Sequence, residues 1–158
     1  MATVETYSVF DMANWFIKKG VDTHKKLQKL CYYAQAWGYV FNNVPMFGSD
    51  FEAWSHGPVN RQLWDALKSY TYCALDRNVF DNIAKTITDK DVLETLEQVW
   101  ATYGGYSGFE LARLSRTETP WLETRKDHAP WEPCNDIIDP EIMKNYYSAL
   151  LIADGVSD

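Results

Sequence analysis

The segment from residue 24 to residue 42 constrains the fold of this chain more than any other. Apolar residues recur along it three and four positions apart, which is typical of a helix: Leu27, Leu30, Cys31, Ala34, Trp37, Gly38 and Phe41. Its other faces are also apolar or aromatic, because Tyr32, Tyr33 and Tyr39 lie between these positions. A helix that is hydrophobic nearly all round must be covered by neighbours on every side. The sequence therefore predicts a buried central helix, capped by Thr23 and closed by Asn42-Asn43.

Shorter helical patterns surround this central segment. Capping residues or a first-turn proline predict where these helices begin: Ser8 with Asp11, Gly57-Pro58, Thr88 with Asp91, Ser107 with Glu110, Thr119-Pro120 and Asp139-Pro140. Residues 44–56 break the helical pattern and allow a small β-hairpin. We therefore expect a mainly α fold of five to seven helices, forming one compact domain over residues 1–158. Its buried centre is expected to hold Leu27, Leu30, Cys31, Ala34, Leu63, Leu96, Val99, Trp100 and Leu111.

Charge and composition restrict the classes of partner. The chain has 158 residues, with 15 Lys and Arg against 22 Asp and Glu, a net charge of −7. Neutralising phosphates needs a basic surface, so we expect no nucleic-acid partner. An acidic protein suits a basic partner better, although negative charge that serves only solubility stays an open alternative. No apolar run reaches the roughly 20 residues of a membrane helix, and the start resembles no signal peptide, so no membrane partner is expected.

Residues that could carry chemistry are scattered. The three cysteines are widely spaced and form no CxxC pair, which favours a reducing cytoplasm over a disulfide framework. The three histidines lie far apart, and no phosphate-binding or nucleophile motif is present. We therefore expect no catalytic residues, no cofactor and no metal site. The alternative is an uncharacterised enzyme centred on His56, which precedes Gly57-Pro58 at an expected helix N-terminus.

Four residues are candidates for binding a partner: Trp54, His56, Arg61 and Trp131. They lie in or next to irregular segments, where binding residues concentrate, and tryptophan and arginine often anchor interfaces. Trp131 lies in a loop over residues 127–138, between two prolines and outside any apolar stripe. Trp54 and Trp131 could instead fold back onto the core, and His56 could tie its loop to the core. The sequence leaves both alternatives open.

Three blocks of sequence resemble one known family. They are KLQKLCYYAQAW (residues 26–37), EAWSHGPV (residues 52–59) and WATYGGYSGFELARLSRTETPW (residues 100–121). In order and spacing they resemble the Panacea-type antitoxin domain of SocA-like and GepA-like phage-associated proteins. One departure matters, because the family often carries Thr-His where this chain has Ser115-Arg116. A role for that histidine is therefore not carried over.

The resemblance implies a function that the residues alone do not reveal. It implies the non-enzymatic antitoxin of a bacterial or prophage toxin–antitoxin pair, which binds a cognate toxin protein directly and blocks it in the cytoplasm. Two variants of this expectation stay open. The chain could be a proteolytic adaptor that delivers its toxin to a host protease, or a prophage protein that binds a host factor.

Overall fold

The computed structural model describes residues 7–156, and its helices and strands confirm the mainly α prediction. In chain order they are α1 (Val9–Lys18), α2 (His24–Asn42), β1 (Glu52–Trp54), β2 (Gly57–Val59), α3 (Arg61–Leu67), the 3-10 turn η2 (Lys68–Tyr70), α4 (Lys90–Tyr103), α5 (Gly108–Ser115), α6 (Thr119–Thr124) and α7 (Pro140–Val156). Seven α-helices and one small antiparallel hairpin therefore make up the regular structure of this part of the chain.

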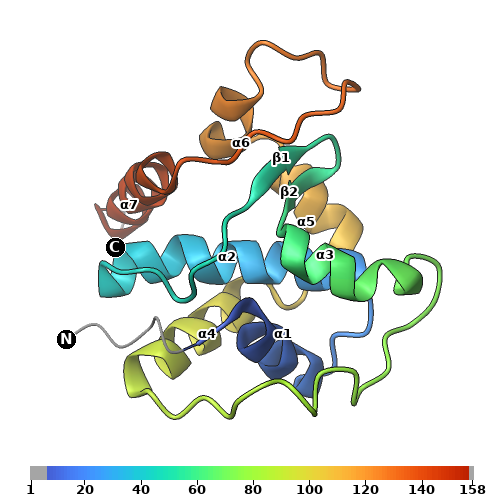
Figure 1. Cartoon of the computed structure of the whole chain (residues 1–158). Helices are drawn as coiled ribbons and strands as arrows, with labels where there is room; N and C mark the ends of the chain where they lie inside the picture. The colour runs from blue at the N-terminus through green and yellow to red at the C-terminus, as the bar shows by residue number, and fades with distance from the viewer. Residues whose placement is uncertain (1–6, 157–158) are drawn as a thin grey trace.

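Helix α2 lies at the centre, as its sequence predicts. Figure 1 shows α1 and α4 on one side of it, and the hairpin, α5, α6 and α7 on the other. The helix packs against α1, α4, α5 and α7, so its faces are covered all round. Leu27, Leu30 and Ala34 are completely buried there. The other expected core residues are also buried, except that Trp100 lies half-buried at the edge of the core.

Most helix ends follow the predicted capping signals. The backbone N–H of Ser8 donates to Asp11, and Ser107 and Glu110 form the expected reciprocal box at the start of α5. Thr23 caps α2, and Asn43 closes it in the left-handed conformation at φ 63°. Helix α4 starts one residue later than expected, because the carboxylate of Asp89, rather than Thr88, accepts the free N–H groups. A short acidic side chain satisfies these N–H groups well and also complements the helix dipole.

The prediction of a helix starting at Gly57-Pro58 was wrong. These residues form β2, in which Pro58 stands opposite Ala53 of β1, and α3 begins only after Asn60. Gly57 has φ +112°, a backbone conformation that makes the tight turn and that a helix start does not use. Proline is tolerated in this strand because β2 is an edge strand. The hairpin itself was expected, but it spans residues 52–59 rather than lying within 44–56.

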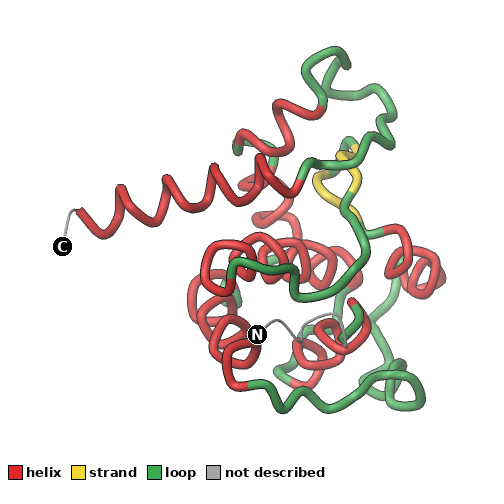
Figure 2. The backbone as a smooth tube through the Cα atoms, turned by 60° about the vertical axis from the view of Figure 1, so that its left-hand side comes forward, coloured by secondary structure: helices red, strands yellow, loops and turns green. Residues whose placement is uncertain are grey.

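The long segment between α6 and α7 completes the hairpin side of the molecule. Its end runs beside β1, where Ala53 N–H donates to Asp136 O at 2.9 Å and Ile138 N–H donates to Phe51 O at 2.8 Å. Figure 2 shows this segment looping beyond the hairpin before α7 extends toward the C-terminus. The hairpin and the loop of residues 127–138 therefore form one continuous surface.

Buried polar side chains of α2 fix the segment that leads into this surface. Gln35 donates to Phe47 O at 2.8 Å and accepts from the N–H groups of Met46 and Phe47. Gln28 and Asn60 exchange two hydrogen bonds, from Gln28 Nε2 to Asn60 O and from Asn60 N to Gln28 Oε1. Each bond engages a backbone group of the segment between α2 and α3. The polar residues of α2 are therefore ties between the helix and residues 46–60.

We predict that Gln35→Leu lowers the free energy of unfolding by at least about 3 kcal/mol. The substitution leaves three buried backbone groups of Met46 and Phe47 unsatisfied, and each costs roughly 1–3 kcal/mol. Chemical denaturation measures the change. Gln62→Leu on the exposed face of α3 is the matched control and should change stability by less than about 0.5 kcal/mol. Equal effects of the two substitutions would contradict this role of Gln35.

Candidate functional site

Two of the predicted binding residues, Trp54 and Arg61, meet on the outer side of the hairpin. The Arg61 guanidinium lies 5.2 Å from the centroid of the Trp54 ring. The centroid of the Trp64 ring, in α3, lies 5.4 Å from that of the Trp54 ring, in β1. Arg61 also forms a two-pronged ion pair with Glu52, with N–O distances of 2.9 and 3.1 Å. Trp54 is half-buried, so it is neither a core residue nor a free anchor.

Glu52 holds this cluster together. Its carboxylate accepts from Arg61 and from Trp54 Nε1, the latter at 2.8 Å. Partial burial acts to raise the pKa of Glu52, but the hydrogen bonds from Arg61 and Trp54 and the charge of Arg61 outweigh it and lower the pKa. The carboxylate therefore stays ionised at neutral pH. It orients an aromatic ring and a guanidinium, two groups that are enriched in interface hot spots.

Trp131 lies on a loop that is held from inside. Its side chain is 78% exposed, whereas Arg125 beneath the loop is only 3% exposed. The Arg125 guanidinium donates to four backbone carbonyls, those of Ala53, Ala129, Pro130 and Glu132. One buried cation thus fixes both the loop and β1. Trp131 is presented to solvent from a constrained backbone, which reduces the entropy lost on binding.

His56 lies at the exposed turn of the hairpin, so the expectation that it sits at a helix N-terminus was wrong. Its backbone carbonyl accepts from Arg116 Nη1 at 3.4 Å. Burial lowers the pKa of its imidazole, and the charges of Lys25, Lys29 and Arg116 lower it further. Among the described residues, no side chain forms a hydrogen bond that would orient this ring. The imidazole is therefore neutral at neutral pH beside cationic neighbours, and no described residue pairs with it as in a catalytic dyad.

Arg116, which the sequence analysis noted only as a departure, reaches this same turn. It follows Ser115 in the third motif block. In the fold it contacts the second block, 60 residues away in sequence. Its place beside the hairpin depends on how α5 packs against β2, and no periodicity of the sequence indicates that packing.

The tyrosines of the first motif block are used inside the protein. Tyr33 and Tyr147 both donate to Glu118 Oε1, at 2.9 and 2.7 Å, and the hydroxyl groups of Tyr32 and Tyr147 lie 3.1 Å apart. Burial raises the pKa of Glu118, although these hydrogen bonds partly oppose the rise. This network joins α2, the start of α6 and α7. It is a structural element of the scaffold rather than a solvent-facing site.

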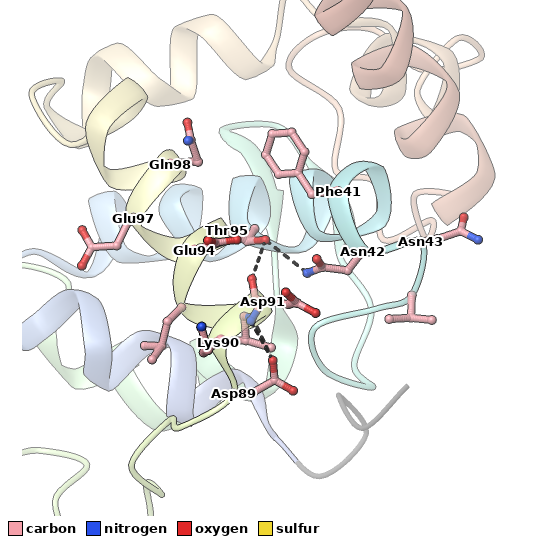
Figure 3. Close-up of a pocket in the computed structure, with 13 residues that line it drawn as sticks. Phe41, Asn42, Asn43, Asp89, Lys90, Asp91, Glu94, Thr95, Glu97 and Gln98 are labelled. Atoms are coloured by element: carbon pink, nitrogen blue, oxygen red, sulfur yellow. Dashed lines mark hydrogen bonds between the residues drawn. The ribbon is translucent and has the colours of Figure 1, made fainter. Parts of the chain in front are cut away.

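An acidic groove on another face was missed by the sequence analysis. It has a volume of about 990 Å³ and runs between the end of α2 and the first turns of α4 (Figure 3). Phe41, which is 43% exposed, and Val44 supply apolar surface, and the lining includes four carboxylates, those of Asp89, Asp91, Glu94 and Glu97, with Lys90. The groove becomes visible only when α2 is placed beside α4, where Asn42 Nδ2 donates to Thr95 Oγ1.

The three motif blocks converge on α2, and the comparison with known families rests on the same region. The family model described as "Antitoxin SocA-like, Panacea domain" matches residues 27–122. This chain belongs to that family. The matched range runs from α2 to α6 and includes the hairpin, the acidic groove and the start of the Glu118 network. No curated protein and no solved structure gives a significant match.

Within residues 7–156, no helix has both the length and the apolar character needed to cross a membrane.

Lys29 of the first motif block is a buried cation held by a backbone carbonyl. It is 2% exposed, and its ammonium donates to Pro58 O at 2.9 Å. Burial lowers its pKa to about 7, and the charges of Lys25 and Arg116 act in the same direction. The unfolded chain keeps a pKa near 10.5, so between these two values it binds more protons than the folded chain. Stability then rises with pH in this window and loses this contribution as pH falls toward 7.

We predict that Lys29→Met removes this pH dependence. Between pH 7 and 8.5, the stability of the wild type relative to Lys29→Met should increase with a slope of at most about 1.4 kcal/mol per pH unit. Urea denaturation of both proteins at several pH values measures the difference, and titrations common to both cancel. A difference that stays flat across this range would show that Lys29 keeps its ordinary pKa.

Proposed function

We propose that this chain is a non-enzymatic antitoxin that neutralises a cognate toxin by binding it directly in the cytoplasm. Membership of an antitoxin-like family carries this proposal. The use of the motif residues within the scaffold supports it, because Gln28, Lys29 and Tyr33 hold backbone or buried groups rather than lining a reaction site. We propose further that residues 1–158 act as one domain, in which α1 and α7 complete the region matched by the family model.

The binding surface that we propose is the hairpin with the loop beside it. Trp54 and Arg61 form one anchor, Trp131 forms a second, and His56 lies at the turn between the strands. Ala53 of β1 bonds to Asp136 of the loop segment, so the two anchors are carried by connected backbone. Anchors on a rigid backbone bind with little loss of entropy. This arrangement suits a surface that must capture a folded toxin.

The test of the function is co-expression with the product of the neighbouring gene. We expect that product to arrest growth when expressed alone, and we expect this chain to restore growth and to co-purify with it. A harmless neighbour, or the absence of an isolable complex, would contradict the proposal. Toxin that disappears in a protease-dependent way on co-expression would assign the chain as an adaptor instead. If the neighbouring product is harmless and the chain captures a host protein, the chain binds a host factor instead of a toxin.

We predict that Trp131→Ala weakens toxin binding by about 1–2 kcal/mol and leaves the melting temperature unchanged. Its exposed side chain contributes to the interface but not to the core. Tyr72→Ala is the matched control, since Tyr72 is 98% exposed in another irregular segment. Calorimetric titration gives both affinities. Equal effects of the two substitutions on affinity would show that Trp131 is not part of the interface.

The Trp54 and His56 double substitution to alanine should also weaken binding by at least about 1–2 kcal/mol. Trp54 packs on Trp64 and Arg61, so this variant should lose some thermal stability as well. Binding measured well below the melting temperature separates the two effects. Normal affinity with a lowered melting temperature would show that Trp54 serves only the fold.

We propose that the acidic groove between α2 and α4 receives a basic segment of the same toxin. Its carboxylates lie on the α4 side and the apolar side chains of Phe41 and Val44 at the end of α2, which fits a segment with both lysine or arginine and apolar side chains. We expect Glu94→Lys to slow association about three- to tenfold at low salt, with a smaller effect at high salt. Asp22→Lys makes the same charge change at an exposed position outside the groove and is the control. Equal slowing by both variants would show that association depends only on the net charge of the protein and not on the groove.

A further inference from the structure

Three side chains that are common metal ligands meet in the loop between α6 and α7. They are His128, Cys134 and Asp136, and their ligand atoms all lie within 4.8 Å of one another. No metal was expected from the sequence, because the three histidines lie far apart and the three cysteines are widely spaced. The fold brings the three together because Arg125 curls the loop by holding the carbonyls of Ala129, Pro130 and Glu132.

Two of these groups are buried without a polar partner among the described residues. His128 Nδ1 is inaccessible to solvent and has no hydrogen bond in the part of the chain that the structure describes. Cys134 is 4% exposed and has a free thiol, and no hydrogen bond joins its sulfur to a described residue. A buried imidazole nitrogen with no partner costs about 1–3 kcal/mol and calls for an explanation. A ligand between these groups supplies one.

We propose that His128, Cys134 and Asp136 bind one Zn²⁺ ion. A thiolate, an imidazole and a carboxylate are the three ligand types that zinc takes, at about 2.0–2.3 Å from the metal. Tetrahedral geometry with these bond lengths places ligand atoms about 3.3–3.8 Å apart, so closing the site needs movements of about 1 Å. Water fills the fourth position. Asp136 is exposed, and its backbone carbonyl is bonded to Ala53, so the ion reaches the site from solvent while the backbone stays fixed.

The bound ion would close the loop that carries Trp131. His128 lies three residues before this tryptophan and Cys134 three residues after it, so zinc cross-links the two sides of the loop. Cross-linking restricts the conformations of the loop in the same way as a short covalent bridge. Metal binding is then a property of the chain alone. Only its consequence, a preorganised Trp131 anchor, rests on the proposed function.

Cobalt substitution tests the site directly on the isolated, tag-free chain after treatment with a chelator. We expect Co²⁺ to bind with one equivalent and to give a thiolate-to-cobalt charge-transfer band in the near ultraviolet, which Zn²⁺ then removes by displacement. Cys134→Ser should abolish the band, and His128→Gln and Asp136→Asn should each weaken binding at least about tenfold. Cys73→Ser and His56→Gln change the same residue types elsewhere and should leave the titration unchanged.

Thermal unfolding gives a second measure of metal binding if one of the other variants folds poorly. At a fixed Zn²⁺ concentration, the metal should raise the melting temperature of the wild type by more than that of Asp136→Asn, whose substituted side chain is exposed and outside the core. No cobalt band in the wild type, or a band that survives Cys134→Ser and is lost in Cys73→Ser, would overturn the proposal. Neither measurement uses the toxin, so failure here leaves the proposed antitoxin function untouched.

Discussion

The hydrogen bonds that buried polar side chains of α2 give to residues 46–60 are the interaction on which the rest of the structure depends. A helix covered on all sides has no need of polar residues for solubility. Gln28, Lys29 and Gln35 nevertheless lie on it, because their side chains bond to backbone groups of the segment between α2 and α3. These bonds hold one side of the hairpin on α2, while Arg125 and the backbone of Asp136 hold β1 from the other side. The surface that carries Trp54 and Arg61 is thus set by residues in the core.

This arrangement separates the scaffold from the surface that we propose for binding. The tyrosines of the first motif block are used by the network around Glu118, and the carbonyl of Pro58 in the second block is used by Lys29. The surfaces that we propose for binding lie at the rim: the hairpin turn, the Trp131 loop and the acidic groove. A domain built in this way can change its rim residues without disturbing its core. That property suits a binding module better than an enzyme, whose site requires fixed polar groups in a cavity.

The sequence predicted the helical fold well because its signals are local. Apolar spacing found α2, and capping residues such as Ser107 and Thr23 marked helix starts to the residue. It failed at Gly57-Pro58, where the same local signal fits both a helix start and a tight strand turn, and only pairing with β1 decides between them. The candidate site was predictable only in part. Trp131 stood out as a tryptophan outside any apolar stripe, whereas the groove, Arg116 and the cluster at Cys134 depend on contacts between distant segments.

Hydrogen–deuterium exchange of the chain, alone and bound to its toxin, shows which segments the toxin covers. We expect binding to slow exchange at residues 52–61 and 127–138, the two segments that carry the proposed anchors. The interior of α2 should change little, because its amides are already protected in the free chain. Protection confined to other surfaces, with both of these segments exchanging as fast as in the free protein, would contradict the account.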